Sequence, residues 1–465
     1  MLVINKKKSV EWGIIILLCT IGLMIIKKIS NYSLNRLVIY TFLLNGILWI
    51  YLFHKEIKKR AYSMAMMHWL FCIFFFCFAP TVQYFYNRFP WILERSDDIL
   101  IRANLFLLCW TLAVVIGSKV MKQKKKVIVV KRKINFFPLL PILTFINIGN
   151  MIVRIKSIGI ENMFSRATNS DVSFSAYGSL SMMISGSLQA TAYFAVVLSI
   201  LKFRTKHKGI GYLLINGGGI LVSYFPTSLA RYATAVIYFG LFLMTYRNVK
   251  KNRVFIFLFI VAFIVILPAL NVFRTTSFNE VNLMKTLKDI LTNLIDTWKK
   301  FDYDAYTIFT LAIDNVDMYG MGGTHILSIL LFWVPRAIWT TKPLSGSYEM
   351  AHDRGLAFDN LSCPLPAEGM LDGGIIGVII LGIAIGYIMH KIDSFYWNYT
   401  DCVENEIDSF DLIYPVIVIF WFFMCRGDMF YTIGFLVAYI IVWKIITCKM
   451  FVRHQGYSIQ IQNLY

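Results

Sequence analysis

Residues 320–377 read GMGGTHILSILLFWVPRAIWTTKPLSGSYEMAHDRGLAFDNLSCPLPAEGMLDGGIIG, and the rest of the chain is organised around them. Their apolar part, residues 326–334, is shorter than the roughly 20 residues that a helix needs to cross a bilayer. The stretch gathers ionisable side chains among prolines and glycines: Arg336, Lys342, His352, Asp353, Arg354, Asp359, Glu368 and Asp372. Charge this dense in a hydrophobic protein indicates a working loop, which the rest of the chain holds at a membrane surface.

Composition places the chain among membrane proteins. Of its 465 residues, 58% are hydrophobic and 15% are charged, whereas a soluble protein has roughly 25% charged residues. Repeated apolar runs of about 20 residues predict an all-α polytopic membrane protein. The net charge of +20 lies in short clusters between these runs, which indicates orientation and contact with anionic lipids and not nucleic-acid binding.

The apolar runs predict about twelve spans. We place them at residues 10–26, 34–53, 64–86, 99–118, 134–153, 176–201, 209–224, 229–246, 254–272, 371–390, 411–425 and 428–447. Basic clusters occupy every second connection, at residues 6–8, 55–60, 119–133, 202–208 and 247–253. The positive-inside rule assigns these connections and both termini to the cytoplasm. Residues 275–370 then form a large extracytoplasmic loop.

Three parts follow from this topology. Residues 1–274 form an N-terminal bundle of about nine spans, residues 275–370 form the extracytoplasmic catalytic loop, and residues 371–465 form the last spans with a cytoplasmic tail. Gly373, Gly377, Gly382 and Gly386 form two GxxxG pairs in the first of those last spans. Such glycines allow close helix packing.

The loop begins with an amphipathic pattern. Met284, Leu287, Leu291, Leu294 and Trp298 recur at intervals of three and four residues, with charged residues between them. This spacing predicts a helix lying in the membrane interface or packed on the roof of the bundle. The short apolar run that follows, residues 326–334, predicts a re-entrant or interfacial hairpin.

Arginines at span ends are candidates for binding an anionic headgroup. Arg231, Arg274 and Arg336 all fall on the outer face, where orientation rules disfavour positive charge. A guanidinium binds phosphate oxygens with two parallel hydrogen bonds, so these residues suit a diphosphate. Lys342 and Arg354 of the same loop are further substrate-binding candidates. The alternative is that such arginines only reach toward lipid headgroups.

Candidate catalytic residues are Glu368, His352 and Arg336. Glu368 lies between proline and glycine just before a span and could accept a proton from a hydroxyl nucleophile; its alternative role is an ion pair with an arginine. His352 precedes Asp353 and Arg354 directly.

Signals for metals and cofactors are weak. Residues 302–304 resemble a DxD metal motif, and Glu94, Asp97 and Asp98 form an acidic cluster, but such patterns are common in loops. No P-loop, dinucleotide fingerprint or common hydrolase motif is present, so we expect neither a cofactor nor a metal. The eight cysteines form no CxxC pair; Cys363 and Cys425 could pair or remain free thiols.

The run LLFWVPRAIWTTKPLSG, residues 330–346, followed by DNLSCPLPAEGMLDGGIIG, residues 359–377, resembles the signature loop of Wzy-type oligosaccharide repeat-unit polymerases. SLARYATAVIYF (228–239) and ALNVFR (269–274) are similar to the arginine-bearing span ends of that family. The resemblance implies that undecaprenyl-diphosphate-linked oligosaccharides are joined into O-antigen or capsular polysaccharide. The reaction would take place on the outer face of the bacterial inner membrane.

The implied partners are a lipid-linked donor and acceptor, membrane lipids and a chain-length regulator protein. Three alternatives remain open. An O-antigen ligase would use the same donor with a different acceptor. A glycosyltransferase acting on lipid-linked sugars would need the acidic loops and a metal. A non-enzymatic flippase of lipid-linked oligosaccharides would show charged residues in mid-span and repeated halves.

The orientation has a direct test. In a chain without other reactive cysteines, Ser345→Cys should react with a membrane-impermeant maleimide in intact cells, and Lys125→Cys should react only after lysis. These positions lie in the predicted outer loop and in a basic cytoplasmic connection. Labelling at position 125 but not at 345 would reverse the topology.

Overall fold

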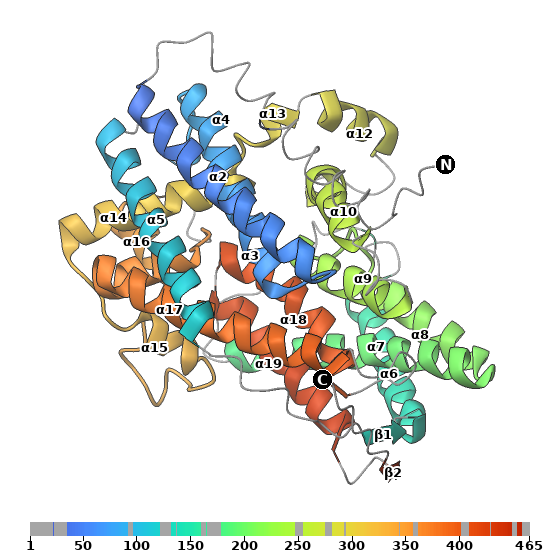
Figure 1. Cartoon of the computed structure of the whole chain (residues 1–465). Coiled ribbons are helices and arrows are strands. Elements are labelled where there is room, and N and C mark those ends of the chain that lie inside the picture. Colours follow the sequence, from blue (N-terminus) through green and yellow to red (C-terminus); the bar gives the residue numbers. More distant parts are fainter. Residues whose placement is uncertain are drawn as a thin grey trace, which may run out of the picture.

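Figure 1 shows the protein as a computed structural model. The structure describes residues 22, 35–91, 96–120, 132–135, 137–159, 164, 178–246, 254–274, 281–292, 294–343, 345–356, 361–400, 409–427, 429–448 and 453–457. The first predicted span, residues 10–26, lies outside these ranges except for Gly22. Glu94 and Asp359 also lie outside them.

The described chain is helical apart from one short ribbon. Its helices are α2 (Arg36–Lys59), α3 (Met64–Phe71), α4 (Ala79–Phe85), α5 (Asp97–Val120), α6 (Leu140–Ile158), α7 (Gly178–Lys206), α8 (Ile210–Ser223), α9 (Arg231–Thr245), α10 (Val254–Val261), α11 (Leu267–Ala269), α12 (Leu283–Thr292), α13 (Leu294–Thr297), α14 (Ala305–Tyr319), α15 (His325–Leu330), α16 (Gly346–Asp353), α17 (Leu365–Thr400), α18 (Ser409–Arg426) and α19 (Met429–Ile446). Two π-helical segments, Cys72–Phe78 and Ala262–Ile266, join α3 to α4 and α10 to α11. Three-residue 3-10 turns occur at Phe137–Leu139, Val272–Arg274 and Phe301–Tyr303. Strands β1 (Arg132–Asn135) and β2 (Arg453–Tyr457) pair antiparallel.

The lengths and composition of these helices confirm a multi-pass membrane protein. Among the described residues, 8 helical segments are long and apolar enough to cross a membrane. Three shorter apolar helices accompany them: α8, α9 and the segment Val254–Ala269. Backbone amides and carbonyls in lipid must be satisfied within the segment, which is why helices carry these runs. The number of twelve spans and the cytoplasmic location of the termini remain predictions.

One span lies at the centre of the bundle. The segment Met64–Phe85, made of α3, its π-helical continuation and α4, is buried along almost its whole length. Its aromatic side chains pack against helices from the second half of the chain; the Phe74 ring lies 5.2 Å from the Phe263 ring, and Phe71 lies 6.0 Å from Phe422. A helix that is apolar on all sides can be surrounded by lipid or by protein. The Met64–Phe85 segment is surrounded by protein.

Helices α5 and α17 approach each other closely through glycines. A Cβ at Gly386 would lie 2.1 Å from the carbonyl oxygen of Val114, and one at Gly117 would lie 2.0 Å from the carbonyl oxygen of Ile383. Gly382 packs against Trp110 and Ala113 of the same seam. Gly382 and Gly386 therefore have the packing role that the GxxxG pattern predicts.

The other GxxxG pair, Gly373 and Gly377, lies where α17 breaks. Gly373 and Gly374 have non-helical backbone angles, and Gly374 has a φ of 58° with a ψ of −147°, a region that only glycine enters readily. Across the break, a Cβ at Gly377 would lie 2.1 Å from the carbonyl oxygen of Gly369, so the two parts of α17 nearly touch. The first part, residues 365–372, therefore ends at Asp372 beside α15.

Residues 275–370 contribute to the bundle itself. Helix α14 is largely buried and packs against α5, where the Tyr306 hydroxyl bonds the Leu100 carbonyl and the Asn104 side chain at 3.1 Å each. The predicted amphipathic helix is two short helices, α12 and α13. Its start faces outward, with Met284 78% exposed, while Trp298 at its end is 1% exposed. The buried end packs on the bundle, whereas a position in the membrane interface remains a prediction.

Two ends of the bundle can be told apart. We call the end that carries residues 281–364 the loop end; there Asp304 bonds Trp91 and Arg426. The opposite end, called the basic end, carries Arg60 3.5 Å from Asp393. In Figure 1 the β-ribbon lies apart from α12 and α13, on the far side of the bundle.

The α5–α17 seam has a direct test. Gly386→Ala should lower the melting temperature of the purified protein, since the new methyl group meets backbone atoms that cannot move alone. Overpacking of this kind costs about 1–3 kcal/mol. Gly149→Ala in α6 is the matched control, because nothing lies within 4 Å of a Cβ there. Equal melting temperatures for the two variants would contradict this packing.

Candidate functional site

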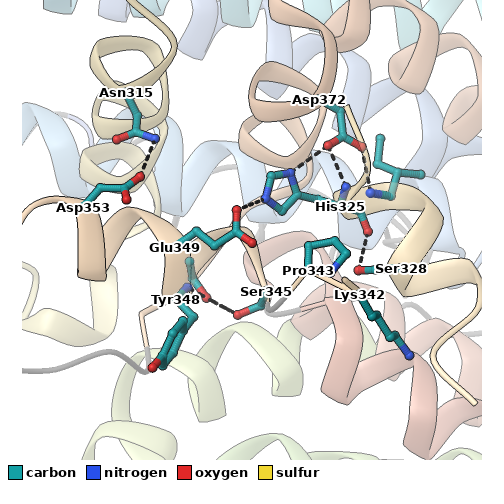
Figure 2. A network of polar contacts seen from close by, with 12 residues as sticks. Asn315, His325, Ser328, Lys342, Pro343, Ser345, Tyr348, Glu349, Asp353 and Asp372 are labelled. Atoms are coloured by element: carbon teal, nitrogen blue, oxygen red, sulfur yellow. Dashed lines mark hydrogen bonds and ion pairs between the residues drawn. The ribbon is translucent and has the colours of Figure 1, made fainter. Parts of the chain in front are cut away.

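The most connected polar cluster of the loop end forms at the break in α17 (Figure 2). Asp372 is the last residue before the two glycines, and its carboxylate accepts hydrogen bonds from the backbone amides of His325 at 2.8 Å and Ile326 at 2.7 Å. It therefore satisfies amides that begin α15 and have no partner inside that helix. The glycine break and the start of α15 are fixed by one carboxylate.

The His325 ring lies between two carboxylates. Its Nδ1 lies 2.7 Å from Asp372 Oδ1, and its Nε2 lies 2.7 Å from Glu349 Oε2. Burial opposes protonation of the ring, but the hydrogen bonds and charges of Asp372 and Glu349 outweigh it and raise the pKa of His325 to about 10. At neutral pH the ring is an imidazolium that donates to both carboxylates.

Glu349 is the accessible member of this cluster. Its side chain is 41% exposed, against 5% for His325. It lies in the first turn of α16, whose N-cap residue Ser345 accepts a hydrogen bond from the Tyr348 amide. A carboxylate whose position is fixed by a buried imidazolium, and which still faces outward, can accept a proton from a bound hydroxyl.

Glu368, the general base that sequence analysis favoured, lies beneath α16. It is 0% exposed, and a Cβ at Gly346 would lie 3.3 Å from its Oε2. A general base must come within hydrogen-bonding distance of the proton that it removes. In this arrangement Glu349 has the access that Glu368 lacks.

Arg336 and Lys342 hold the predicted hairpin closed. The Arg336 guanidinium donates to the carbonyls of Lys342 and Pro343. Lys342 is buried, and its Nζ donates to the carbonyls of Leu331, Phe332 and Val334 at 2.9–3.1 Å. Burial, and then the charge of Arg336, lower the pKa of Lys342. Both side chains are predicted to bind substrate. In the structure they donate these hydrogen bonds to backbone carbonyls of their own loop.

Arg231 is paired with one of the DxD aspartates. Its guanidinium binds Asp302, which also accepts from Asn271. Burial alone would raise the pKa of Asp302, but the charges of Arg231 and Arg426 and these hydrogen bonds lower it. The carboxylate is therefore ionised and serves as an ion-pair partner. Arg274 ends a 3-10 turn nearby in sequence, and its side chain lies outside the described part of the chain.

Asp304, the second DxD aspartate, forms a separate group of hydrogen bonds. It accepts from Ser362 Oγ at 2.7 Å, from Trp91 Nε1 at 2.9 Å and from Arg426 at 3.0 Å. The two aspartates thus hold loop-end segments together. Within the described residues, no group of three His, Cys, Asp or Glu side chains could hold a metal ion.

His352 and Arg354 lie at the other end of α16. His352 is exposed in its last turn, and Arg354 lies 3.8 Å from Asp314 of α14. Asn315 of α14 donates to Asp353 at 3.4 Å, on the opposite side of Figure 2 from Asp372. Asp353 and Arg354 therefore tie the end of α16 to α14, and His352 does not contact the His325 cluster in the described contacts.

Cysteines predicted as a possible pair are both free. Cys363 and Cys425 are buried thiols. Cys425 Sγ lies 3.5 Å from His68 Nδ1 in the core. The free-thiol alternative therefore holds in this structure.

Sequence analysis missed His325 and Glu349 as site residues. Glu349 and Asp372 lie 24 and 47 positions after His325 along the chain. No spacing rule brings such distant residues together. The usable signal was the sequence Asp372-Gly373-Gly374, because a carboxylate followed by two glycines at a span entrance indicates a helix break that aims the carboxylate elsewhere.

The charge on His325 predicts a pH dependence. The pKa is about 10 in the folded protein, above its ordinary value of 6.5. The cluster should therefore stabilise the fold fully below about pH 6.5 and lose this contribution as pH rises through about 10, each pKa unit corresponding to about 1.4 kcal/mol. Melting temperatures of the natural chain and of His325→Gln should differ most at pH 6 and converge near pH 10. His352→Gln is the control for loss of an exposed imidazole; a gap between the natural chain and H325Q that stays constant across this range would contradict the charged state.

Comparison of the chain with protein-family models, with curated proteins and with solved structures finds no match in any of the three. The site's own chemistry therefore carries the functional argument.

Proposed function

We propose that this protein is a glycosyltransferase that joins oligosaccharide repeat units carried on a polyprenyl diphosphate. The observation that carries the proposal is the outward-facing Glu349 carboxylate held by the buried His325 imidazolium, 2.7 Å away. Both residues belong to the stretch 320–377, whose motifs resemble those of Wzy-type polymerases. The loop end would then face the outer side of the bacterial cytoplasmic membrane.

The proposed reaction needs one base and one cationic region. A hydroxyl of the acceptor glycan attacks the anomeric carbon of the donor, the bond from that carbon to the diphosphate oxygen breaks, and the hydroxyl proton passes to Glu349. The buried imidazolium holds the Glu349 carboxylate in a fixed orientation before the proton arrives. The polyprenyl diphosphate leaves with the negative charge, so the energy of the new linkage comes from the donor and no nucleotide is consumed.

Cations at the loop end are suited to the leaving group. Arg231 and Arg426 both contribute to the ionisation of Asp302, which shows that two guanidinium groups lie close enough to act on one anion. A diphosphate approaching this region would compete with Asp302 and Asp304 for these guanidinium groups. Arg336 is half-buried and donates to the Pro343 carbonyl of the hairpin, so its contribution would be to fix the conformation of the hairpin.

Exposed apolar side chains on the loop support a lipid-linked substrate. Leu330, Trp333 and Ile338 of the hairpin are among its exposed large apolar side chains, at 58–78% exposure. Met284 of α12 is exposed in the same way. Exposed apolar side chains are stable in contact with acyl chains, so this surface supports the proposal of a polyprenyl-linked substrate.

Glu349→Gln tests the base. It keeps the hydrogen-bonding shape but cannot take up the proton, so turnover of lipid-linked repeat units by purified protein should fall by about 10² or more while donor binding remains. Asp317→Asn is the matched control, because Asp317 is an exposed loop-end carboxylate paired only with Arg102 in the described contacts. Normal chain growth in Glu349→Gln would remove Glu349 from the reaction.

The same variants separate polymerase from ligase. Cells lacking the gene and carrying Glu349→Gln should show a surface polysaccharide ladder reduced to a single repeat unit. Loss of all capping from the lipid acceptor would instead identify a ligase, which uses the same donor. An unchanged ladder in the gene deletion would remove both functions.

A further inference from the structure

A cavity of about 500 Å³ lies between α6, α7, the turn after α8, α9 and α19. Leu229, Ala230, Tyr232 and Ala233 of the stretch 228–239 line it, and none of its lining residues belongs to the His325 cluster. It lies next to the hairpin, however. Gly434 of α19 packs against Phe332 of the hairpin and Met182 of α7, while the adjacent Phe435 lines the cavity.

The α7 wall of the cavity carries two different stripes. Ser181, Ser185 and Gln189 recur every four residues, and Leu180, Ile184 and Leu188 run beside them. Residues four apart lie on one face of a helix, so a polar stripe and an apolar stripe descend together over about 12 Å. Ser181 and Ser185 are exposed, whereas Gln189 is 3% exposed. Gln189 therefore lies at the buried end of the polar stripe.

The deep end of this cavity holds an unsatisfied amide. Gln189 Oε1 is buried and has no hydrogen-bond partner among the described residues. Ser223, the last residue of α8, precedes the lining residue Tyr224, and its Oγ is likewise buried without a hydrogen-bond partner among the described residues. Leaving a buried polar atom without a partner costs about 1–3 kcal/mol, and such a cost is offset when a ligand supplies the missing hydrogen bond.

The opposite wall carries a positive charge. Arg154 of α6 lines the cavity, donates through Nε to the Ser223 carbonyl at 3.3 Å and lies 5.8 Å from the centre of the Tyr224 ring. The Tyr224 hydroxyl accepts from Asn150 at 3.0 Å. These contacts hold the guanidinium in place at the cavity.

We propose that this cavity binds the phosphate head of a lipid. Arg154 would neutralise the phosphate, and Ser181 and Ser185 would donate hydrogen bonds to it. Gln189 Oε1 would accept a hydrogen bond from a protonated phosphate oxygen or from a hydroxyl of the head group. The acyl or prenyl chain would lie along Leu180, Ile184 and Leu188. A guanidinium beside hydroxyls suits phosphate oxygens, and the parallel apolar stripe suits the chain attached to them.

This inference rests on the proposed function in one respect. Joining two lipid-linked glycans brings two anionic lipids to the protein at once, and the Arg231–Arg426 region accounts for only one of them. The cavity, beside the same hairpin, supplies the second phosphate site. The shared chemistry is a lipid phosphate, which could come from a polyprenyl phosphate or from a bilayer phospholipid.

Binding of undecaprenyl phosphate and of phosphatidylglycerol to the purified protein, measured by native mass spectrometry, tests the site without turnover. Arg154→Gln should weaken binding by about tenfold or more. Lys156→Gln is the matched control, since Lys156 is exposed on the same end of α6 and does not line the cavity. Loss confined to undecaprenyl phosphate identifies the substrate lipid, and equal loss for both lipids identifies a general phospholipid site. Unchanged binding of both lipids overturns the proposal.

Gln189→Leu keeps the test informative if Arg154→Gln unfolds. It removes the unsatisfied amide, so it should raise the melting temperature and still weaken lipid binding. A purely structural Gln189 would change stability alone, and unchanged binding in Gln189→Leu would count against the site. Because binding is measured without an acceptor glycan, a protein that binds the lipid but never extends a chain would leave the site standing and remove the proposed polymerase function.

Discussion

The bond between Asp372 and the start of α15 is the constraint on which the loop end depends. Two glycines let α17 break directly after this residue, so its carboxylate leaves the axis of the span and receives the amides of His325 and Ile326. The same carboxylate holds the His325 ring, which in turn orients Glu349. Helices α17, α15 and α16 thus meet around the buried His325 ring.

The other end of α17 repeats this arrangement. Asp393 is fully buried and accepts from the amides of Met64 and Ala65, which begin α3, and from the Tyr414 hydroxyl. The peripheral span α17 is therefore joined at both ends to other helices through a carboxylate that bonds backbone amides. Since lipid gives no hydrophobic preference for one helix partner over another, directional bonds of this kind determine which helices meet.

Charged side chains at the loop end divide into two groups by what they bind. Arg336 and Lys342 bond backbone carbonyls, and Arg231 and Arg426 bind the two aspartates near the start of α14. The hairpin is held in one conformation by the first group. In the second group, Arg231 and Arg426 both act on Asp302. Glu349 differs from all of these, because its partner is buried and it is itself accessible. Rigidity around one accessible carboxylate is what a site for proton transfer requires.

The sequence by itself determined the class of the protein. Apolar runs of span length, basic clusters in alternate connections and the GxxxG glycines follow from the cost of exposing backbone groups to lipid and from local packing. It could not show which span is central, since Met64–Phe85 and Arg36–Lys59 have nearly equal mean hydropathy, 1.8 and 1.7, and lipid is as apolar as a protein core. Nor could it show that α14 packs inside the bundle or that Glu368 is buried, because both depend on what covers them.

Only the tertiary structure decided the site. His325, Glu349 and Asp372 come from three elements, and a lone histidine with two distant acids has no signature in sequence. The cavity beside Gln189 was hidden for the same reason: two serines and a glutamine in an apolar span have meaning only once Arg154 of another helix stands opposite them. Local spacing determines helices, whereas the meeting of charges depends on how those helices are packed.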